Sequence, residues 1–392
     1  MNETAKAHGL DGKLVDPDWP PLNLDEVCAL LKSFPDTGEP IEIVSASPRP
    51  FSAASVIRTS CEKIFVKRHA RVVRDVEGLM EEHRFMEHLR ANGIGVPRIF
   101  ETRSGDTAFQ SGESTYEVHA IPAGVDAYED AISWTPFRSI EHARSSGEML
   151  ARLHFAAESF CAPARKPRPL VASFTIFASQ SATEGLEQYL AAHPVLKHDA
   201  LSLEDCASAL DLLAPFHDEL RPLMPALKPL WTHNDLHASN LFWSDRSPHA
   251  DATSVIDFGL ADRTNVVYDI AQAIERNIVE WLVLMQNPNR GDEVPVHLEH
   301  LWAMLDRYEQ IRTLSRTEAA ALAPMLALCH AEFALTEADY FLGVLQSPPK
   351  ARVATSDYLV GHAQWFRGPG GVKIVEPLRQ WAETRQTQAA PA

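Results

Sequence analysis

The feature that most constrains this 392-residue chain is the stretch of residues 231–261, WTHNDLHASNLFWSDRSPHADATSVIDFGLA. Its first part places four side chains able to handle protons or metals within eight residues: His233, Asp235, His237 and Asn240. Short apolar runs on either side of a turn-prone segment, residues 244–253, predict a β-hairpin. Because Asp257 follows the second apolar run, the hairpin returns it to the first loop. We therefore expect Asp235, Asn240 and Asp257 to converge.

The three converging residues suit one kind of chemistry. Asn240 supplies a neutral oxygen and Asp257 a charged one, which are the hard ligands that Mg²⁺ prefers when phosphates and water complete its coordination. Asp235 remains beside the metal as a carboxylate that can orient a hydroxyl and accept its proton. A metal, a phosphate and a positioned hydroxyl together describe phosphoryl transfer. Taken singly, each residue is better explained as a polar turn residue or a strand-end cap.

The joint pattern H-x-D-x4-N, an apolar pair and then D-F-G resembles the catalytic and metal-binding loops of the aminoglycoside phosphotransferase and choline kinase superfamily. That family usually has glycine where this chain has Asn234. The resemblance implies that Asp235 is the catalytic base and that Asn240 and Asp257 are Mg²⁺ ligands. It also implies that His233 anchors the loop and that Asp269, in a Y-D-x-A motif, braces it.

The same resemblance, over roughly residues 41–290, implies an α+β, protein-kinase-like fold of two lobes, a small, mostly β N-lobe and a larger helical C-lobe. We expect an N-terminal extension with a short helix over residues 1–40, polar and proline-marked at its start. The N-lobe is expected over residues 41–121, and the helical C-lobe with the catalytic and metal loops over 122–392. Residues 162–230 are expected to form a helix-rich insertion that contains many prolines.

The N-lobe begins with three strand patterns, IEIVSAS, SVIRTS and KIFVKRH, over residues 41–69. The connection between the first two, SPRPFSAA, lies where kinase-like folds cover the nucleotide phosphates, but it contains no glycine. The backbone N–H groups of Ser52 and Ala53 and the Ser52 hydroxyl are still suited to cradle phosphate oxygens. An ordinary hairpin loop is the alternative.

Lys67, at the end of the third strand, is placed to reach the nucleotide's phosphates. The following helix, residues 74–92, has an apolar stripe with Glu82 at its edge and Glu81 nearly opposite. We therefore expect a Lys67–Glu82 ion pair that holds the ammonium in place. The alternative for Glu82 is a solvated charge on the helix flank.

Two further strands are predicted, RIFETR and STYEVHAI, within residues 98–121, followed by the linker between the lobes. In kinase-like folds this linker grips the purine through its backbone. Because Pro122 has no N–H, the donor is expected to be Ile121 or Ala123.

Composition narrows the functional classes. The formal charge of −17 argues against nucleic-acid binding and favours, weakly, an amine-bearing acceptor. Five dispersed cysteines without a C-x-x-C motif indicate free thiols in a reducing, cytoplasmic compartment. The N-terminus has no apolar leader. The sequence also lacks a run of about 18 apolar residues, the length that a membrane span needs, so no span is expected.

The sequence thus predicts an enzyme that moves the γ-phosphoryl group of ATP, with Mg²⁺, to a hydroxyl of a small molecule. Aminoglycosides, amino-alcohols, homoserine-like amino acids and sugars remain open as acceptors. One alternative is a non-catalytic nucleotide-binding protein of the same fold. A second is a hydrolase in which His233, His237 and Asp235 bind Zn²⁺, although H-x3-H suits zinc only on a helix.

Overall fold

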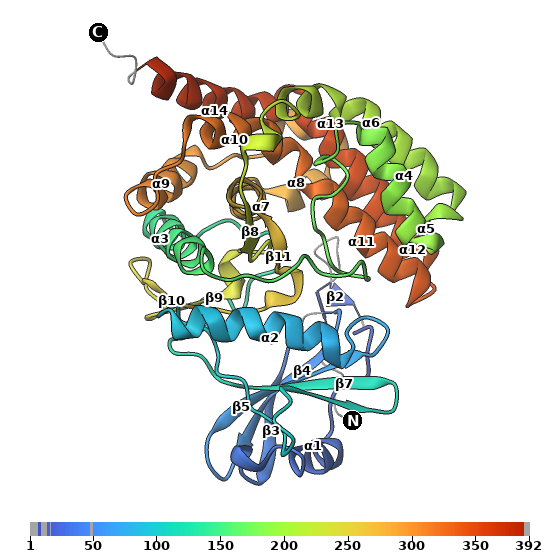
Figure 1. Cartoon of the computed structure of the whole chain (residues 1–392), viewed down its shortest axis with the longest axis vertical. Helices are drawn as coiled ribbons and strands as arrows, with labels where there is room; N and C mark the ends of the chain where they lie inside the picture. The colour runs from blue at the N-terminus through green and yellow to red at the C-terminus, as the bar shows by residue number, and fades with distance from the viewer. Residues whose placement is uncertain (1–6, 9–13, 16, 48–49, 388–392) are drawn as a thin grey trace.

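A five-stranded antiparallel sheet builds the smaller of two lobes (Figure 1). The computed structural model describes residues 7–8, 14–15, 17–47 and 50–387. The strands follow the order β3-β4-β5-β7-β6. Their bounds are β3 (Pro40–Ala46), β4 (Ala53–Thr59), β5 (Lys63–Ala70), β6 (Ala108–Ser111) and β7 (Ser114–Ala120).

The two faces of this sheet differ in chemistry because side chains alternate along each strand. One face is apolar: Ile64 and Val66 of β5 and Val118 of β7 are buried in one cluster with α1 (Leu24–Leu31). The opposite face carries polar residues. In the register of β5 against β7, Lys67 lies across from Glu117. Helix α2 (Val76–Ala91) lies between the sheet and the other lobe, and buries Glu82 and His83 (Figure 1).

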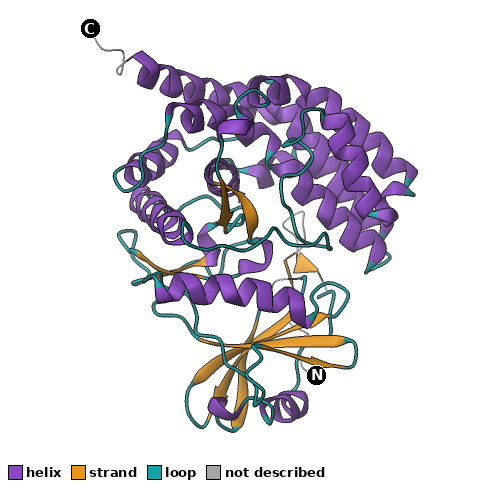
Figure 2. Cartoon of the chain, viewed as in Figure 1, coloured by secondary structure: helices purple, strands orange, loops and turns teal. Residues whose placement is uncertain are grey.

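The larger lobe is helical, as Figure 2 shows in purple. Its helices are α3 (Ile140–Ala157), α4 (Ala182–Ala192), α5 (Pro194–Lys197), α6 (Ala200–Leu220), α7 (Val266–Ile278), α8 (Trp281–Gln286), α9 (Leu298–Glu309), α10 (Arg316–Leu328), α11 (His330–Gly343), α12 (Pro348–Arg352), α13 (Gly361–Arg367) and α14 (Pro369–Thr387). Three two-stranded ribbons complete the described strands: β1 (Ala7–His8) with β2 (Leu14–Val15), β8 (Pro229–Thr232) with β11 (Asp262–Asn265), and β9 (Leu241–Trp243) with β10 (Ala252–Val255).

The predicted two-lobed α+β architecture is confirmed. The helix that follows Lys67 and the catalytic hairpin both form, as α2 and β9–β10. The boundary between the lobes near residue 122 stays a prediction, and β7 ends at Ala120, directly before it.

One strand was predicted in the wrong place. Of the pattern RIFETR, only Ile99 forms an isolated bridge, to His119. The pairing strand is instead β6, and the hairpin turn falls at Gly112, whose φ of 57° suits glycine. Sequence AFQS of β6 lacks the alternation of apolar and polar residues on which the prediction depended.

Two glycines let the N-lobe approach the catalytic hairpin closely. The Gly95 carbonyl accepts from the Val255 N–H at 2.8 Å, and a Cβ at Gly95 would lie 2.0 Å from the Thr253 carbonyl oxygen. At Gly124, whose φ is 106°, a Cβ would lie 2.5 Å from the carbonyl oxygen of Trp243. The linker and the hairpin are therefore in direct backbone contact, which fixes the catalytic hairpin against the N-lobe.

The N-terminal extension is packed against both lobes. The Trp19 indole donates to the Tyr340 hydroxyl of α11 at 2.9 Å, and Asp18 pairs with Lys350 of α12. Leu22 is buried in the N-lobe core beside α1. Residues 17–23 are thus structured, whereas most of the polar start predicted to precede them lies outside the described residues.

One stretch, Arg316–Gly343, is long and apolar enough to cross a membrane by length and composition alone. It forms α10 and α11, and 94% of its most apolar window is buried inside the protein. Its apolar character is accounted for by packing in the core of the helical lobe.

Candidate active site

The loop that follows β8 is held by a backbone conformation and by the side chain of Asn234. Asn234 has a left-handed φ of 64°, the conformation that glycine adopts most easily and that asparagine tolerates better than most residues. Its amide donates to the Leu260 carbonyl at 3.0 Å and its oxygen accepts from the Thr232 hydroxyl at 2.7 Å. Asparagine in place of the family's usual glycine therefore keeps the left-handed backbone conformation. It also adds side-chain hydrogen bonds to Thr232 and Leu260, one on each side of the loop.

This arrangement gives a test of Asn234. We expect Asn234→Ala to lower the free energy of unfolding by about 2–3 kcal/mol, because it strains the backbone and leaves buried partners unsatisfied. Asn234→Gly should cost less, since it removes the same hydrogen bonds without a Cβ. Chemical denaturation of the two variants checks the ranking, and equal losses would contradict the role of the left-handed backbone.

Asp269, in the first turn of α7, holds the loop that follows β8 through hydrogen bonds. Its carboxylate accepts from the N–H groups of His233 at 3.0 Å and Asn234 at 2.7 Å. His154 Nε2 lies 2.9 Å from the same carboxylate, and both side chains are fully buried. Although burial raises the pKa of Asp269, these bonds bring it below its ordinary value. The predicted bracing contact is confirmed.

His233 is an anchor because both of its ring nitrogens meet the backbone. Nδ1 accepts from the Asp235 N–H at 3.2 Å, so Nε2 carries the proton and donates to the Ile256 carbonyl at 3.0 Å. The His233–His237–Asp235 zinc site considered as an alternative is therefore not supported, since His233 has no nitrogen left for a metal.

The hairpin brings the predicted metal residues together. Leu241 of β9 pairs with Val255 of β10, and the Asn240 carbonyl accepts from the Ile256 N–H at 2.9 Å, one residue before Asp257. The Asn240 amide group donates to the Asp235 backbone carbonyl at 2.9 Å, which leaves its Oδ1 as an acceptor. The loops thus offer one neutral and one anionic oxygen, a donor set that fits Mg²⁺.

Lys67 reaches this centre from the N-lobe. Its Nζ lies 3.2 Å from Asp257 Oδ1. Burial raises the pKa of Asp257, but the nearby ammonium outweighs it and brings the value to about 2. For Lys67 the effects have the opposite sign. Burial lowers its pKa, but the negative charges of Asp257, Glu117 and Glu82 raise it above its ordinary value. Both groups are therefore charged at neutral pH.

The predicted Lys67–Glu82 ion pair is wrong. Glu82 is buried as expected, but its Oε1 pairs with Arg74 Nε at 2.8 Å and Arg165 Nη2 at 2.6 Å. Both arginines also donate to the Gly259 carbonyl in the metal loop, at 2.8 Å and 3.0 Å. Two buried guanidinium groups outcompete one lysine for the carboxylate, because they bind it through directed hydrogen bonds. Glu82 thus supports the metal loop rather than Lys67.

The remaining predicted nucleotide residues lie in the N-lobe and directly after its strand β7. Ser52 and Ala53 are buried where the β3–β4 loop enters β4, and the neighbouring Phe51 ring packs on Tyr340, with ring centroids 5.3 Å apart. Ile121 directly follows β7, and the Ala123 carbonyl accepts from the Thr253 hydroxyl at 2.7 Å. Their contacts with a nucleotide stay predictions.

Arg276, a buried residue of α7, is a further site residue that was not predicted from the sequence. Its Nε donates to Asp235 Oδ1 at 3.1 Å, and its Nη1 meets Glu275 at 2.8 Å. The guanidinium lies over the Phe333 ring at 4.2 Å. Burial raises the pKa of Asp235 above its ordinary value although Arg276 opposes the shift. The available signal was its spacing of seven residues from Asp269, which places both charged side chains on one face of the same helix.

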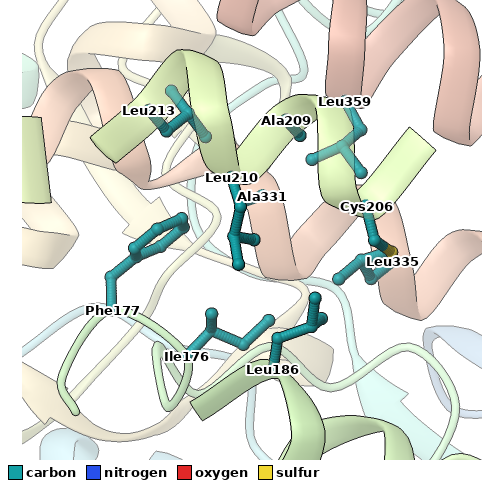
Figure 3. A pocket seen from close by; sticks show the side chains of 10 residues that line it. All are labelled: Ile176, Phe177, Leu186, Cys206, Ala209, Leu210, Leu213, Ala331, Leu335 and Leu359. Atoms are coloured by element: carbon teal, nitrogen blue, oxygen red, sulfur yellow. The ribbon is translucent and has the colours of Figure 1, made fainter. Parts of the chain in front are cut away.

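A small cavity in the helical lobe is separate from this site (Figure 3). It is lined by apolar side chains from α4, α6 and α11, among them Leu186, Leu213 and Leu335. None of the predicted site residues lines it. With a volume of about 10 Å³ it is a packing gap rather than a place for an acceptor.

The fold and the loops together define a kinase-like enzyme of phosphoryl transfer. The model of the phosphotransferase enzyme family, APH, matches residues 49–293, and the chain belongs to this family. It is 28% identical over 292 residues to a homoserine kinase of Rhodospirillum rubrum, covering 69% of this chain and 71% of the relative. It is 26% identical over 284 residues to that of Granulibacter bethesdensis, covering 69% and 72%.

Among solved structures, a microcompartment-associated aminopropanol kinase shares the fold with a TM-score of 0.60 and 16% identity. The likeness covers 88% of this chain and 97% of that one. Together these findings confirm an ATP-dependent phosphotransferase that acts on a hydroxyl of a small molecule, and give no support to a non-catalytic nucleotide-binding protein.

Proposed function

We propose that the acceptor is a small amino acid with a side-chain hydroxyl, of the homoserine class. The observation that carries this is Arg276, which contacts Asp235 and leaves its Nη2 without a hydrogen-bond partner among the described residues. A guanidinium beside the catalytic carboxylate is suited to bind the carboxylate of an acceptor through directed hydrogen bonds. The homoserine kinases among the relatives act on a molecule with such a group.

Glu337, on α11, supplies the complementary charge. Its Oε2 is buried and also has no partner within the described part of the chain. Burial, opposed by Arg276 and reinforced by Asp235 and Glu275, raises its pKa to about 8. Glu337 is thus a proton-bearing carboxyl at neutral pH that a substrate ammonium would convert to the charged form. An amino acid offers both charges to these two groups, whereas an amino-alcohol offers only one.

In the proposed reaction, Asp235 holds the acceptor hydroxyl and takes its proton as that oxygen bonds to the γ-phosphorus. The bond from the γ-phosphorus to the β-phosphate oxygen breaks, and ADP leaves. Asn240 and Asp257 would hold Mg²⁺, which when bound neutralises phosphate charge. Lys67 orients the phosphates, the backbone of Ser52 and Ala53 covers them, and the Ile121 N–H grips the purine. A cytoplasmic location fits this use of ATP.

The acceptor proposal is tested by removing one charged group at a time. With Mg-ATP and an ADP-release assay, we expect kcat/KM for homoserine to exceed that for 3-amino-1-propanol, which lacks the carboxylate, and for 4-hydroxybutyrate, which lacks the amine. Each loss should cost at least about tenfold, since a hydrogen bond to a charged group contributes roughly 1.5–3 kcal/mol.

A matched variant separates the two charges. Glu337→Gln should raise the KM for homoserine while leaving the kinetics with 4-hydroxybutyrate unchanged, because that acceptor has no ammonium to lose. If an aminoglycoside or the amino-alcohol were turned over as well as homoserine, the proposed acceptor class would be wrong, although the phosphotransferase assignment would stand.

A further inference from the structure

Outside the catalytic centre, one carboxylate on the polar face of the N-lobe sheet is surrounded by imidazoles. Glu117 of β7 has three histidine Nε2 atoms at 2.8 Å: those of His69 on β5, His83 on α2 and His119 on β7. Glu117 and His83 are almost fully buried, and the His119 side chain is 13% exposed. The phosphoryl-transfer chemistry described above uses none of the three histidines.

We infer that His83, Glu117 and His119 form a binding site for a divalent transition-metal ion of the zinc class. One ligand atom from each of these residues lies within 4.8 Å of the others. Two imidazoles and a carboxylate suit Zn²⁺ and its neighbours rather than Mg²⁺, which prefers oxygen ligands alone. Three protein ligands leave one position for water.

Two further hydrogen bonds orient the ligands as metal sites require. His69 binds the carboxylate oxygen, Oε1, that the other two histidines leave free, which fixes the plane of Glu117. His83 Nδ1 lies 2.8 Å from the Thr107 hydroxyl. When the metal takes the Nε2 lone pair of His83, the proton moves to Nδ1 and is donated to Thr107. Such outer partners hold metal-binding histidines in one orientation and one tautomer.

Small side-chain rotations are enough to place the three ligand atoms around a metal ion. Tetrahedral zinc with bonds of about 2.0–2.1 Å needs ligand atoms roughly 3.3 Å apart. The 2.8 Å contacts of Glu117 with His83 and His119 must lengthen slightly, and all three ligand atoms already lie within 4.8 Å of one another. The metal would connect α2 to β7. Its ligand His83 directly follows Glu82 in the chain, and its ligand Glu117 lies across from Lys67 in the pairing of β5 with β7.

The test uses the full chain stripped of metal by a chelator and then held in excess Mg²⁺. Titration with Co²⁺ should give the visible absorption of nitrogen-bound cobalt, saturating at about one ion per chain. Zn²⁺ should displace the cobalt signal and raise Tm, because an ion that binds only the folded state stabilises it.

Variants locate the ion. His119→Ala and Glu117→Gln should each weaken cobalt binding at least about tenfold. His88→Ala, also on α2, and Asp257→Asn, at the magnesium centre, should leave it unchanged. The inference is overturned if the wild-type chain gives no cobalt absorption, if Asp257→Asn abolishes it, or if His119→Ala retains it. The wild-type titration decides even if a variant fails to fold, and catalytic activity enters none of these readouts.

Discussion

Asp235→Ala is expected to lower kcat by about a hundredfold or more while the enzyme still binds ATP. General acid–base groups contribute about 10²–10⁴-fold, and Asp235 also positions the acceptor hydroxyl. The fold should survive, because Asp269 rather than Asp235 holds the loop backbone. Single-turnover measurement of phosphoryl transfer, with ATP binding followed separately, gives the two quantities needed.

The outcome also bears on Arg276. In Asp235→Ala this guanidinium loses one of its charged partners but keeps Glu275 and Tyr358, at 2.8 Å and 2.9 Å. A loss of acceptor affinity without a loss of kcat would assign Asp235 to binding alone. Near-wild-type turnover would refute its role as the catalytic base.

Glu82→Ala should have the largest effect on stability, lowering the free energy of unfolding by about 3–5 kcal/mol. It leaves Arg74 and Arg165 as buried cations without their shared carboxylate, and breaking a buried pair in this way is costly. Burial, only partly offset by Glu82, already lowers the pKa of Arg74 to about 10. Because both arginines hold the Gly259 carbonyl, activity should fall together with stability.

The matched control is Glu77→Ala on the same helix. Glu77 pairs with Lys166 at 3.1 Å, but both side chains are more than half exposed, so the change should cost less than about 1 kcal/mol. Thermal and chemical denaturation of the two variants measure the difference. If Glu82→Ala kept wild-type stability and only changed the KM for ATP, the originally predicted partnership with Lys67 would be restored.

The parts of the site that sequence predicts are those determined locally. Asp235, Asn240 and Asp257 lie on two loops joined by one short hairpin, so turn residues and strand periodicity suffice to bring them together. The helix carrying Glu82 was equally predictable, as was its buried face. Strand β6 was not, because its four residues lack a periodic pattern.

The partners of Glu82 and Asp235 were not predictable because they come from distant segments. Arg165 lies near the start of the insertion, 83 residues beyond Glu82, and Arg276 lies 41 residues beyond Asp235. The periodicity of apolar residues predicts which face of a helix is buried. It does not predict which cation from a distant segment will contact that face. The choice between Lys67 and two arginines is made by tertiary packing alone.

The N-terminal contacts of Trp19 and Asp18 change where the functional unit begins. The family match starts at residue 49, after α1, β3 and the segment that touches α11 and α12. A chain that began at residue 49 would lack β3, an edge strand of the sheet. It would also lack the contacts of Trp19 and Asp18 with the helical lobe. The folded unit of this enzyme is therefore larger than the segment that the family model matches.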